Sequence, residues 1–335
     1  MKIVFFEAEK WECDILQQIC CNHELVFTED ELGIDNVELY SNADIISPFV
    51  HSDLSCSVLE RFRHLKFVAT RSTGYDHIDL DYCASNGIPV SNVPVYGDQT
   101  VAEHVFALLL AISHKLPEAI NRTRKGDFSQ KGLQGFDLQG KTLGVIGTGA
   151  IGKRVVEIAQ GFRLNVLACD TSPDHVFADQ RPVSYVDMDR LLEQSDIVTL
   201  HVPGSKSAAP LLSDREFARM KDGVVLINTA RGSLVDTQAL LHALADGKVA
   251  AAGLDVLPDE PSIREEAELI RSFFDKKHDL ETLFANHVLL HMRNVIITPH
   301  SAFNTKEAAE RILQTTGENI IGFIRGEAGN IVNKQ

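Results

Sequence analysis

The sequence lacks an excess of positive charge, a long apolar run and cysteines at C-x-x-C spacing. It has 32 lysine and arginine residues against 47 acidic ones, and the net charge of −15 argues against nucleic acid or an anionic membrane surface as a general partner. The longest apolar stretch, residues 105–112, is too short to span a bilayer. None of the six cysteines forms a C-x-x-C pair, so we expect reduced thiols in a cytoplasmic protein.

The length and apolar content predict two domains. A chain of 335 residues that is 44% hydrophobic can bury more than one core. Residues 1–99 alternate between strand and helix patterns, which is typical of a parallel sheet covered by helices. The expected strands are 3–6, 25–27, 44–47, 67–70 and 89–91, and the expected helices are 12–20, 56–62 and 80–85.

A glycine-rich turn dominates the middle of the chain. An apolar strand pattern at 143–146 leads directly into Gly147-x-Gly149-x-x-Gly152, and helical spacing follows at 153–162. This is the dinucleotide-binding fingerprint in its required setting. Gly147 permits the tight turn, Gly149 lets the backbone approach a pyrophosphate, and Gly152 allows close packing of helix and strand. The phosphates would then lie at the helix N-terminus.

An acid follows the next predicted strand, 165–169. Asp170 is placed to hydrogen-bond the ribose hydroxyls and to repel a 2′-phosphate, which favours NAD over NADP. The alternatives are an ordinary tight turn at the glycines and a solvated surface acid at Asp170. The coincidence of strand, turn, helix and acid favours the nucleotide site.

The rest of the chain suggests a discontinuous first domain. We expect an NAD-binding domain at 100–298 and a substrate-binding domain made of 1–99 and 299–335, because the helix at 306–325 follows the last strand and can return to the first domain. The fold class is therefore α/β, with two Rossmann-like, doubly wound parallel sheets and an active-site cleft between the domains.

Further elements are expected within the second domain. An apolar helix is expected at 100–116, buried between domains or in a dimer interface. A polar arm or loop is expected at 121–140, and an irregular, partly helical insertion at 261–293. The later strands are expected at 197–201, 224–228, 250–254 and 295–298, with a capping box at Ser213 and Glu216 and a helix at 237–245 capped by Asp236 and closed by Gly247.

Charged side chains follow several of the predicted strands. The strand at 224–228 is followed by Arg231, and the strand at 250–254 by Asp255 and Glu260. The strand at 295–298 is followed by His300. Ligands of open α/β sheets bind beyond the carboxyl ends of the strands, on the same edge as the glycine turn. Arg231 suits a substrate carboxylate and a polarised keto oxygen, and a protonated His300 suits proton donation during hydride transfer to a 2-keto acid. Glu260 beside His300 would favour the imidazolium and orient the ring.

Each of these residues has an ordinary alternative role. An arginine after a strand is often a surface ion-pair residue, a glutamate between prolines is often solvated, and a lone histidine is often structural. A catalytic role is favoured only because all three residues are expected at the same sheet edge as the glycine turn. His287 and His291, four residues apart, have no third ligand pattern, so no metal site is expected.

These motifs together resemble the D-isomer-specific 2-hydroxyacid dehydrogenases. The resemblance covers residues 66–325 and rests on GTGAIG at 147–152, INTARGSLVD at 227–236, GLDV at 253–256 with Glu260, and TPHSA at 298–302. RSTGYDHID at 71–79 and VPVY at 93–96 are most similar to the D-lactate dehydrogenase branch.

The resemblance implies an NAD-dependent oxidoreductase that interconverts a small 2-keto acid, pyruvate in particular, and its D-2-hydroxy acid. It also implies a homodimer formed through the NAD-binding domain. The triad would be Arg231, Glu260 and His300. The implied cofactor contacts are Gly147, Gly149, Ala150, Ile151, Gly152, Asp170, Val202, Pro203, Thr229, Ala230 and Asp255.

The substrate carboxylate would be bound by the backbone of Ser72, Thr73 and Gly74, together with Tyr96 and Arg231. Two alternatives stay open within the family resemblance. One is a glyoxylate or hydroxypyruvate reductase, and the other is a non-enzymatic, NAD-responsive binding protein similar to the corepressors of the family.

Overall fold

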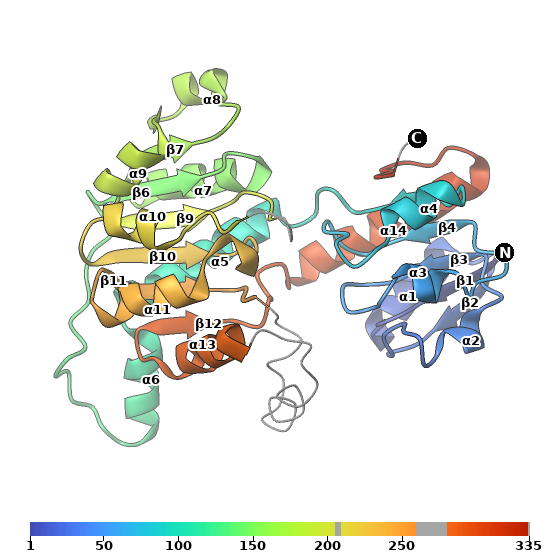
Figure 1. Cartoon of the computed structure of the whole chain (residues 1–335), viewed down its shortest axis with the longest axis horizontal. Helices are drawn as coiled ribbons and strands as arrows, with labels where there is room; N and C mark the ends of the chain where they lie inside the picture. Colours follow the sequence, from blue (N-terminus) through green and yellow to red (C-terminus); the bar gives the residue numbers. More distant parts are fainter. Residues whose placement is uncertain (205–208, 259–279, 334–335) are drawn as a thin grey trace. The chain divides into compact units, whose positions relative to one another are not determined.

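The computed structural model describes residues 1–204, 209–258 and 280–333, and the chain divides into two compact units. One unit combines Met1–Tyr96 with Asn304–Gln335, and the other is Gly97–Phe303. Each contains one parallel sheet with helices on both faces, so the predicted α/β fold class with two Rossmann-like sheets is confirmed (Figure 1). Among the described residues, no helix is long and apolar enough to cross a membrane.

The first unit is a five-stranded sheet in the order β2-β1-β3-β4-β5, with every neighbouring pair parallel. Its strands are β1 Lys2–Phe5, β2 Glu24–Phe27, β3 Ile45–Ser47, β4 Phe67–Ala69 and β5 Val90–Ser91. Its helices are α1 Lys10–Ile19, α2 Val37–Tyr40, α3 Cys56–Leu59, α4 Leu80–Ser85 and α14 Lys306–Arg325.

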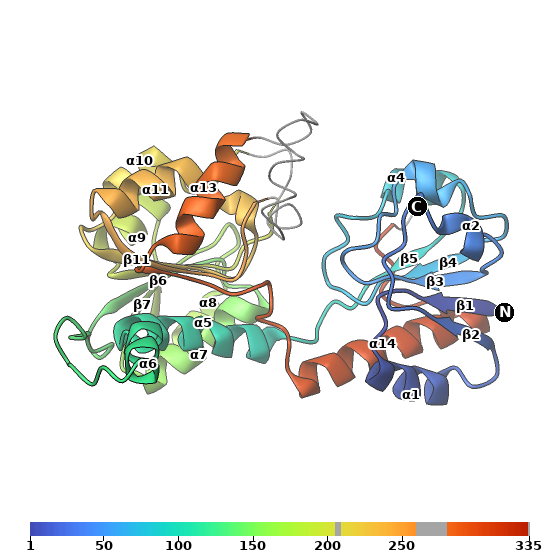
Figure 2. The same cartoon turned by 90° about the horizontal axis from the view of Figure 1, so that it is seen from below.

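Alternation along the strands of this unit supplies two cores. Ile3 and Phe5 belong to the core under α1 and α14, whereas Val4 and Phe6 belong to the core under α2, α3 and α4 (Figure 2). The C-terminal helix α14 is part of the first core, because Phe323 stacks on Phe67 with ring centroids 4.3 Å apart. The chain thus returns to its first sheet after some 200 intervening residues.

The second unit is a seven-stranded parallel sheet in the order β12-β11-β10-β9-β6-β7-β8. Six of these strands follow the doubly wound order of dinucleotide-binding domains, with the strand order reversing between β6 and β9. The strands are β6 Thr142–Ile146, β7 Asn165–Cys169, β8 Val183–Tyr185, β9 Ile197–Leu200, β10 Val224–Asn228, β11 Val249–Leu254 and β12 Val295–Ile297.

Helices cover both faces of the second sheet as well. Figure 2 shows α5 and α7 on one face, and α9, α10, α11 and α13 on the other. The helices are α5 Asp98–Ser113, α6 Leu116–Arg124, α7 Ala150–Gly161, α8 His175–Gln180, α9 Met188–Gln194, α10 Asp214–Arg219, α11 Thr237–Ala245 and α13 Leu280–His291, with a short 3-10 turn at Gly232–Leu234.

The predicted strands are confirmed, and their ends differ from the prediction by one residue at most. The first helices of the second unit, in contrast, differ from the prediction. The apolar helix α5 ends at Ser113 rather than at residue 116, because Lys115 adopts a left-handed conformation with φ 51°. Its apolar side chains are buried within the unit itself, where Phe106 stacks on Phe162 at 5.2 Å. Its burial therefore needs neither a second domain nor a dimer.

Part of the segment expected to be an arm or loop is helical. Helix α6 begins at Leu116, carries Pro117 in its first turn and is stabilised by a Glu118–Arg122 ion pair of 2.7 Å one turn apart. The end of the expected irregular insertion, Leu280–His291, is a regular helix, α13. The earlier part of this expected insertion, residues 261–279, lies outside the described residues.

Candidate active site

The glycine turn after β6 has the backbone geometry that its sequence predicts. Gly147 is left-handed, with φ +92°, and a side chain there would meet the carbonyl oxygen of His201 at 2.5 Å. A side chain at Gly152 would collide with the carbonyl oxygen of Gly147, so only glycine allows this contact between helix and turn. Gly149, by contrast, faces open space. The turn is therefore tight where it packs and open where a pyrophosphate would approach.

The N-terminus of α7 is suited to an anion. Gly149 caps the helix without a side chain, and the first turn contains no acidic residue. Ala150 is exposed and Ile151 half-buried at this end. The first N–H groups of a helix lack partners within the helix, and the helix dipole adds positive potential there.

Asp170 lies beside the glycine turn. It follows β7 directly, and its carboxylate accepts hydrogen bonds from the backbone N–H of Thr148 at 2.6 Å and from that of Ser172 at 2.8 Å. The Thr148 hydroxyl also donates to it and lies 2.8 Å from the Tyr185 hydroxyl. Burial alone would raise the pKa of Asp170, but these hydrogen bonds outweigh it and lower the pKa, which keeps the carboxylate charged at neutral pH.

The loops after β9 and β10 complete this edge of the sheet. A side chain at Gly147 would meet Val202, so the Val202–Pro203 segment lies directly against the glycine turn. After β10, the hydroxyl of Thr229 is buried and has no hydrogen-bond partner within the described part of the chain. A buried hydroxyl without a partner on a nucleotide-binding edge indicates a ligand contact.

The turn that carries Arg231 is held by Asn228, the last residue of β10. The Asn228 side chain accepts from the N–H of Ala230 at 3.0 Å and donates to the carbonyl of Arg231 at 2.9 Å. Gly204 packs against the Arg231 side chain, and Gly232 packs against the backbone of Leu257. The backbone that carries the half-buried Arg231 side chain is thus held in place at the carboxyl edge of the sheet.

The loop that carries His300 is clamped by Asp255. This carboxylate is 1% exposed and accepts hydrogen bonds from the Thr298 hydroxyl and from the backbone N–H groups of Ser301 and Ala302. His300 itself is left-handed, with φ 50°, and its N–H donates to the carbonyls of Asp255 and Thr298, each at 2.9 Å. The buried charge fixes the backbone of the loop and leaves the His300 side chain exposed.

Sequence reasoning missed a second histidine in this clamp. Nε2 of His104, on helix α5, lies 3.0 Å from the Thr298 hydroxyl and 3.5 Å from Oδ1 of Asp255. His104 precedes both Asp255 and Thr298 by more than 150 positions in the sequence, so sequence spacing gives no signal for these contacts. Only the packing of α5 near β11 brings them together.

The first unit presents the loop at 72–74. The Ser72 hydroxyl donates to the carbonyl of Gly74 at 2.6 Å, and the Thr73 hydroxyl donates to that of Val93 at 2.8 Å. Among the described residues, the backbone N–H groups of Ser72, Thr73 and Gly74 donate to no acceptor. The carbonyl of Tyr96 accepts from Nε of Arg311 at 2.7 Å. Glu260, the third member of the predicted triad, lies outside the described residues.

The family model of the D-isomer specific 2-hydroxyacid dehydrogenase NAD-binding domain matches residues 106–302. D-lactate dehydrogenase of Escherichia coli is 34% identical over 333 residues, covering 98% of both chains. Glyoxylate reductase of Thermococcus litoralis is 33% identical, covering 89% of this chain and 86% of its own. The chain also superposes on the D-lactate dehydrogenase of Aquifex aeolicus, solved with NAD and lactic acid, with 35% identity, 99% coverage of both chains and a TM-score of 0.86.

The chain belongs to the D-isomer specific 2-hydroxyacid dehydrogenase family. Membership makes it an NAD-dependent oxidoreductase. The predicted cofactor, NAD, is therefore confirmed. The open face at Gly149, the charged Asp170 and the Thr229 hydroxyl, which has no hydrogen-bond partner among the described residues, fit this cofactor.

His201 is another titratable group of the dehydrogenase at this edge. It follows β9, its Nε2 lies 2.9 Å from the Thr199 hydroxyl, and burial lowers its pKa to about 3. The ring is therefore neutral at physiological pH and takes no part as a proton donor. Its carbonyl lies against Gly147, which makes it a packing residue of the glycine turn.

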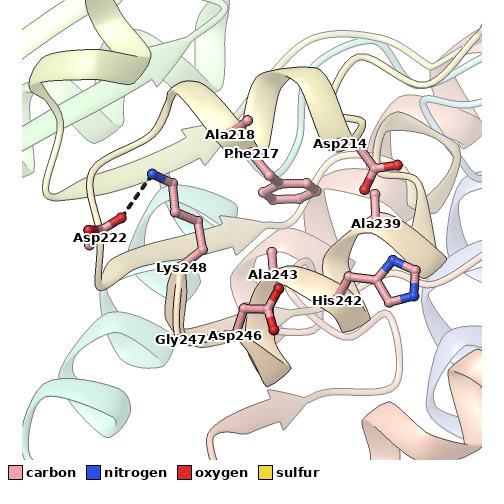
Figure 3. A pocket seen from close by; sticks show the side chains of 10 residues that line it. All are labelled: Asp214, Phe217, Ala218, Asp222, Ala239, His242, Ala243, Asp246, Gly247 and Lys248. Carbon is pink, nitrogen blue, oxygen red and sulfur yellow. Dashed lines mark hydrogen bonds and ion pairs between the residues drawn. The ribbon is translucent and has the colours of Figure 1, made fainter.

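A cavity of about 500 Å³ in this dehydrogenase lies elsewhere, between α10 and α11 (Figure 3). Its wall includes Phe217, Ala243 and the Lys248–Asp222 ion pair of 2.9 Å. Asp222 lies two residues before β10 and Lys248 one residue before β11, so the cavity lies at the amino edge of the sheet. None of the predicted site residues lines it.

The histidine pair considered as part of a metal site lies on α13. The rings of His287 and His291 are 4.6 Å apart, and Nδ1 of His291 lies 2.8 Å from the carbonyl of His287. Within residues 1–204, 209–258 and 280–333, no group of three or more metal-ligating side chains is found.

Proposed function

We propose that the protein interconverts pyruvate and D-lactate with NAD as the hydride carrier. The observation that carries the proposal is the position of Arg231 and His300 after β10 and β12. These strands flank β11 at the same sheet edge as the glycine turn. The nearly full-length similarity to the Escherichia coli D-lactate dehydrogenase supports pyruvate as the substrate.

In this proposal, Arg231 binds the substrate carboxylate with its forked donors and polarises the keto oxygen. His300 holds a proton and delivers it to that oxygen during reduction, then accepts it back during oxidation. Glu260 orients the His300 ring and favours its charged form. Bound NAD supplies or accepts the hydride. The Asp255 clamp keeps the His300 backbone in place throughout the reaction.

The cofactor would be held mainly by the second unit's carboxyl edge. Gly147, Gly149 and Gly152, with Ala150 and Ile151, would hold the pyrophosphate, and Asp170 the adenosine ribose. The remaining contacts would come from the loops that follow β9, β10 and β11, at Val202, Pro203, Thr229, Ala230 and Asp255.

The substrate-binding residues of the first unit would be the loop at 72–74 and Tyr96. The proposal is supported by the three backbone N–H groups of the loop, which donate to no acceptor among the described residues. Backbone N–H groups of this kind bind a carboxylate without a positively charged side chain in the same loop. Residues 1–99 with 299–335 would then form the substrate-binding domain, and 100–298 the NAD-binding domain.

We also propose a homodimer formed through the NAD-binding domain, in a reducing cytoplasm. Leu116 and Ile120 of α6 are 43% and 47% exposed, and Phe128 just beyond the helix is 80% exposed. We take these three exposed apolar side chains, which are close together in the sequence, as a candidate contact cluster, because protein–protein contacts commonly bury such residues. All six cysteines are free thiols, which suits the cytoplasm.

The double variant Ile120→Glu with Phe128→Glu tests the dimer. We expect the wild-type protein to sediment at twice the chain mass of 37.0 kDa and the variant at the mass of one chain, because buried carboxylates oppose association. Val176→Glu is the matched control, since Val176 is an apolar residue on α8 that is 69% exposed outside this cluster. A wild-type monomer, or a variant that sediments as the wild type does, contradicts the proposal.

Two other functions compete with pyruvate reduction. Similarity to the Thermococcus litoralis glyoxylate reductase supports a glyoxylate or hydroxypyruvate reductase. A non-enzymatic, NAD-responsive binding protein of corepressor type is the other alternative, and it predicts no turnover at all.

A substrate panel separates these functions. Pyruvate, glyoxylate, hydroxypyruvate and bulkier 2-keto acids are added to the protein with NADH or NADPH, and absorbance at the nicotinamide band is followed. We expect the highest kcat/KM for pyruvate with NADH, and a marked loss with NADPH because the charged Asp170 repels the 2′-phosphate. A preference for glyoxylate assigns the first alternative, and no turnover with any acid assigns the second.

A further inference from the structure

A buried arginine joins three neighbouring strands at the carboxyl edge of the first sheet. Arg71 is 1% exposed, and its guanidinium donates to the carbonyls of Phe6 at 2.6 Å, Glu7 at 2.9 Å and Ser47 at 2.8 Å. These carbonyls lie at the ends of β1 and β3, and Arg71 follows β4. Its backbone N–H also donates to the carbonyl of Pro48 at 2.9 Å. One side chain thus ties the ends of β1, β3 and β4 together.

The carboxylate of Glu7 holds the loop that follows β3. It accepts hydrogen bonds from the backbone N–H of Phe49 at 3.1 Å, His51 at 3.0 Å and Ser52 at 3.1 Å, and from the Ser52 hydroxyl. Four donors from one loop converge on one carboxylate. Carboxylates accept some of the stronger hydrogen bonds found in proteins.

The backbone of Glu7 is held in an uncommon conformation. Its φ is 53°, in the left-handed region that residues with a side chain rarely adopt. Such conformations persist where surrounding contacts determine them, and they cluster at functional sites. Here the Glu7 carbonyl is fixed by Arg71 and its N–H by the carbonyl of Asp30.

A second acidic side chain, Glu12, lies beside the buried arginine. Nε of Arg71 lies 3.8 Å from the Glu12 carboxylate, and burial raises the pKa of Glu12 although Arg71 opposes the shift. Burial likewise lowers the pKa of Arg71. Buried ion pairs are often no more stabilising than apolar residues of the same size. A cluster of this kind therefore calls for a second role, such as fixing a unique loop geometry.

The contacts run continuously from Glu7 to the loop at 72–74. Glu7 holds the loop after β3, the Pro48 carbonyl of that loop accepts from Arg71, and the Phe49 ring lies 5.9 Å from the guanidinium. Ser72 comes next in the chain and begins the row of three N–H groups that donate to no acceptor among the described residues. The Arg71 backbone therefore fixes the start of this row, and Val93 and Asn92 hold its other side by donating to the carbonyls of Ser72 and Thr73.

We propose that Glu7 is a positioning residue for the loop at 72–74, acting through the loop after β3 and Arg71. The inference rests on the proposed function, in which this loop binds the carboxylate of a 2-keto acid. Glu7 touches no reacting atom. It keeps the N–H groups of the loop oriented before the substrate arrives, which lowers the entropy lost on binding.

Glu7→Gln is the first test. Whichever carboxylate oxygen becomes the amide nitrogen, at least one backbone N–H of the loop loses its acceptor. We expect KM for pyruvate to rise about tenfold, which corresponds to the loss of about 1.4 kcal/mol of binding, while kcat and KM for NADH stay within twofold. Hydrogen exchange at the amides of 49–52 should accelerate, with exchange in β1 and β4 unchanged.

Glu7→Asp is the second variant, and it separates the loss of the loop contacts from a general loss of folding. Aspartate tolerates the left-handed conformation better than glutamate does, and its shorter side chain cannot reach all the loop donors. We expect a normal melting temperature and the same rise in KM. Glu24→Gln, at an exposed position on the edge strand β2, is the control and should behave as the wild type.

The outcomes separate the two proposals. Wild-type turnover of pyruvate, combined with unchanged KM in both Glu7 variants, overturns the role of Glu7 alone. A parallel loss of kcat, of NADH binding and of thermal stability also overturns it, because a purely structural residue would act in this way. If the wild type turns over no short 2-keto acid, the proposed function fails, and the assignment of the loop fails with it.

Discussion

Replacing His300 with asparagine should lower kcat for pyruvate reduction by about 10²–10⁴-fold, which is the usual contribution of a positioned acid–base group. Asparagine is the informative replacement because His300 is left-handed, with φ 50°, and asparagine adopts this conformation more readily than most residues. The Asp255 clamp on the loop would stay intact, so that only the imidazole is lost. Steady-state kinetics with saturating NADH measure the effect.

The control for His300→Asn is cofactor binding. Because the glycine turn and Asp170 lie at other strands of the sheet, the dissociation constant of NADH, measured by fluorescence titration, should change less than twofold. A variant that keeps the wild-type kcat would show that another group moves the proton. His201 is unsuited to that role, since its pKa of about 3 keeps it neutral.

Replacing Arg231 with alanine should lower kcat/KM for pyruvate by about 10²–10⁴-fold. Two charge-assisted hydrogen bonds to the carboxylate, worth about 1.5–3 kcal/mol each, would be lost. The loss should appear mainly as weaker substrate binding. The turn itself should persist, because Asn228 holds it through backbone atoms of Ala230 and Arg231.

Arg231→Lys is the matched variant. Lysine keeps the positive charge but lacks the planar fork, so it should recover only part of the lost kcat/KM. Equal activity of the lysine variant and the wild type would show that charge alone matters. Wild-type activity of the alanine variant would remove Arg231 from the site.

The geometry of the glycine turn was predictable from sequence because its determinants are local. Gly147 needs a positive φ, Gly152 needs an absent side chain, and both requirements fall within one turn between a strand and a helix. The periodicity changes from strand to helix within the same dozen residues. Asp170 was identified because it ends the next strand, and the contact to Thr148 at 2.6 Å places it beside the turn.

The contacts that hold the loops of the proposed active site could not be predicted. The clamp on the His300 loop joins His104, Asp255 and Thr298 from a helix and two strand ends, and no spacing rule links them. The Glu7 carboxylate reaches donors more than 40 residues away. Both depend on strand order, which is set by non-local pairing.

Some differences had local signals that the sequence prediction overlooked. Residues 121–124, the end of helix α6, fall in the segment predicted to be an arm, although Pro117 in a first turn and the Glu118–Arg122 spacing are both typical of a helix in this region. Asn228 at a strand end before a tight turn is likewise a recognised turn former. These signals lie in single residues and were masked by the polar composition around them.

The most direct test of the central claim is the configuration of the product. Purified protein is incubated with pyruvate and NADH, and the lactate formed is resolved by chiral chromatography. The account predicts D-lactate in an amount equal to the NADH consumed. L-lactate, or no lactate with the NADH intact, would contradict it.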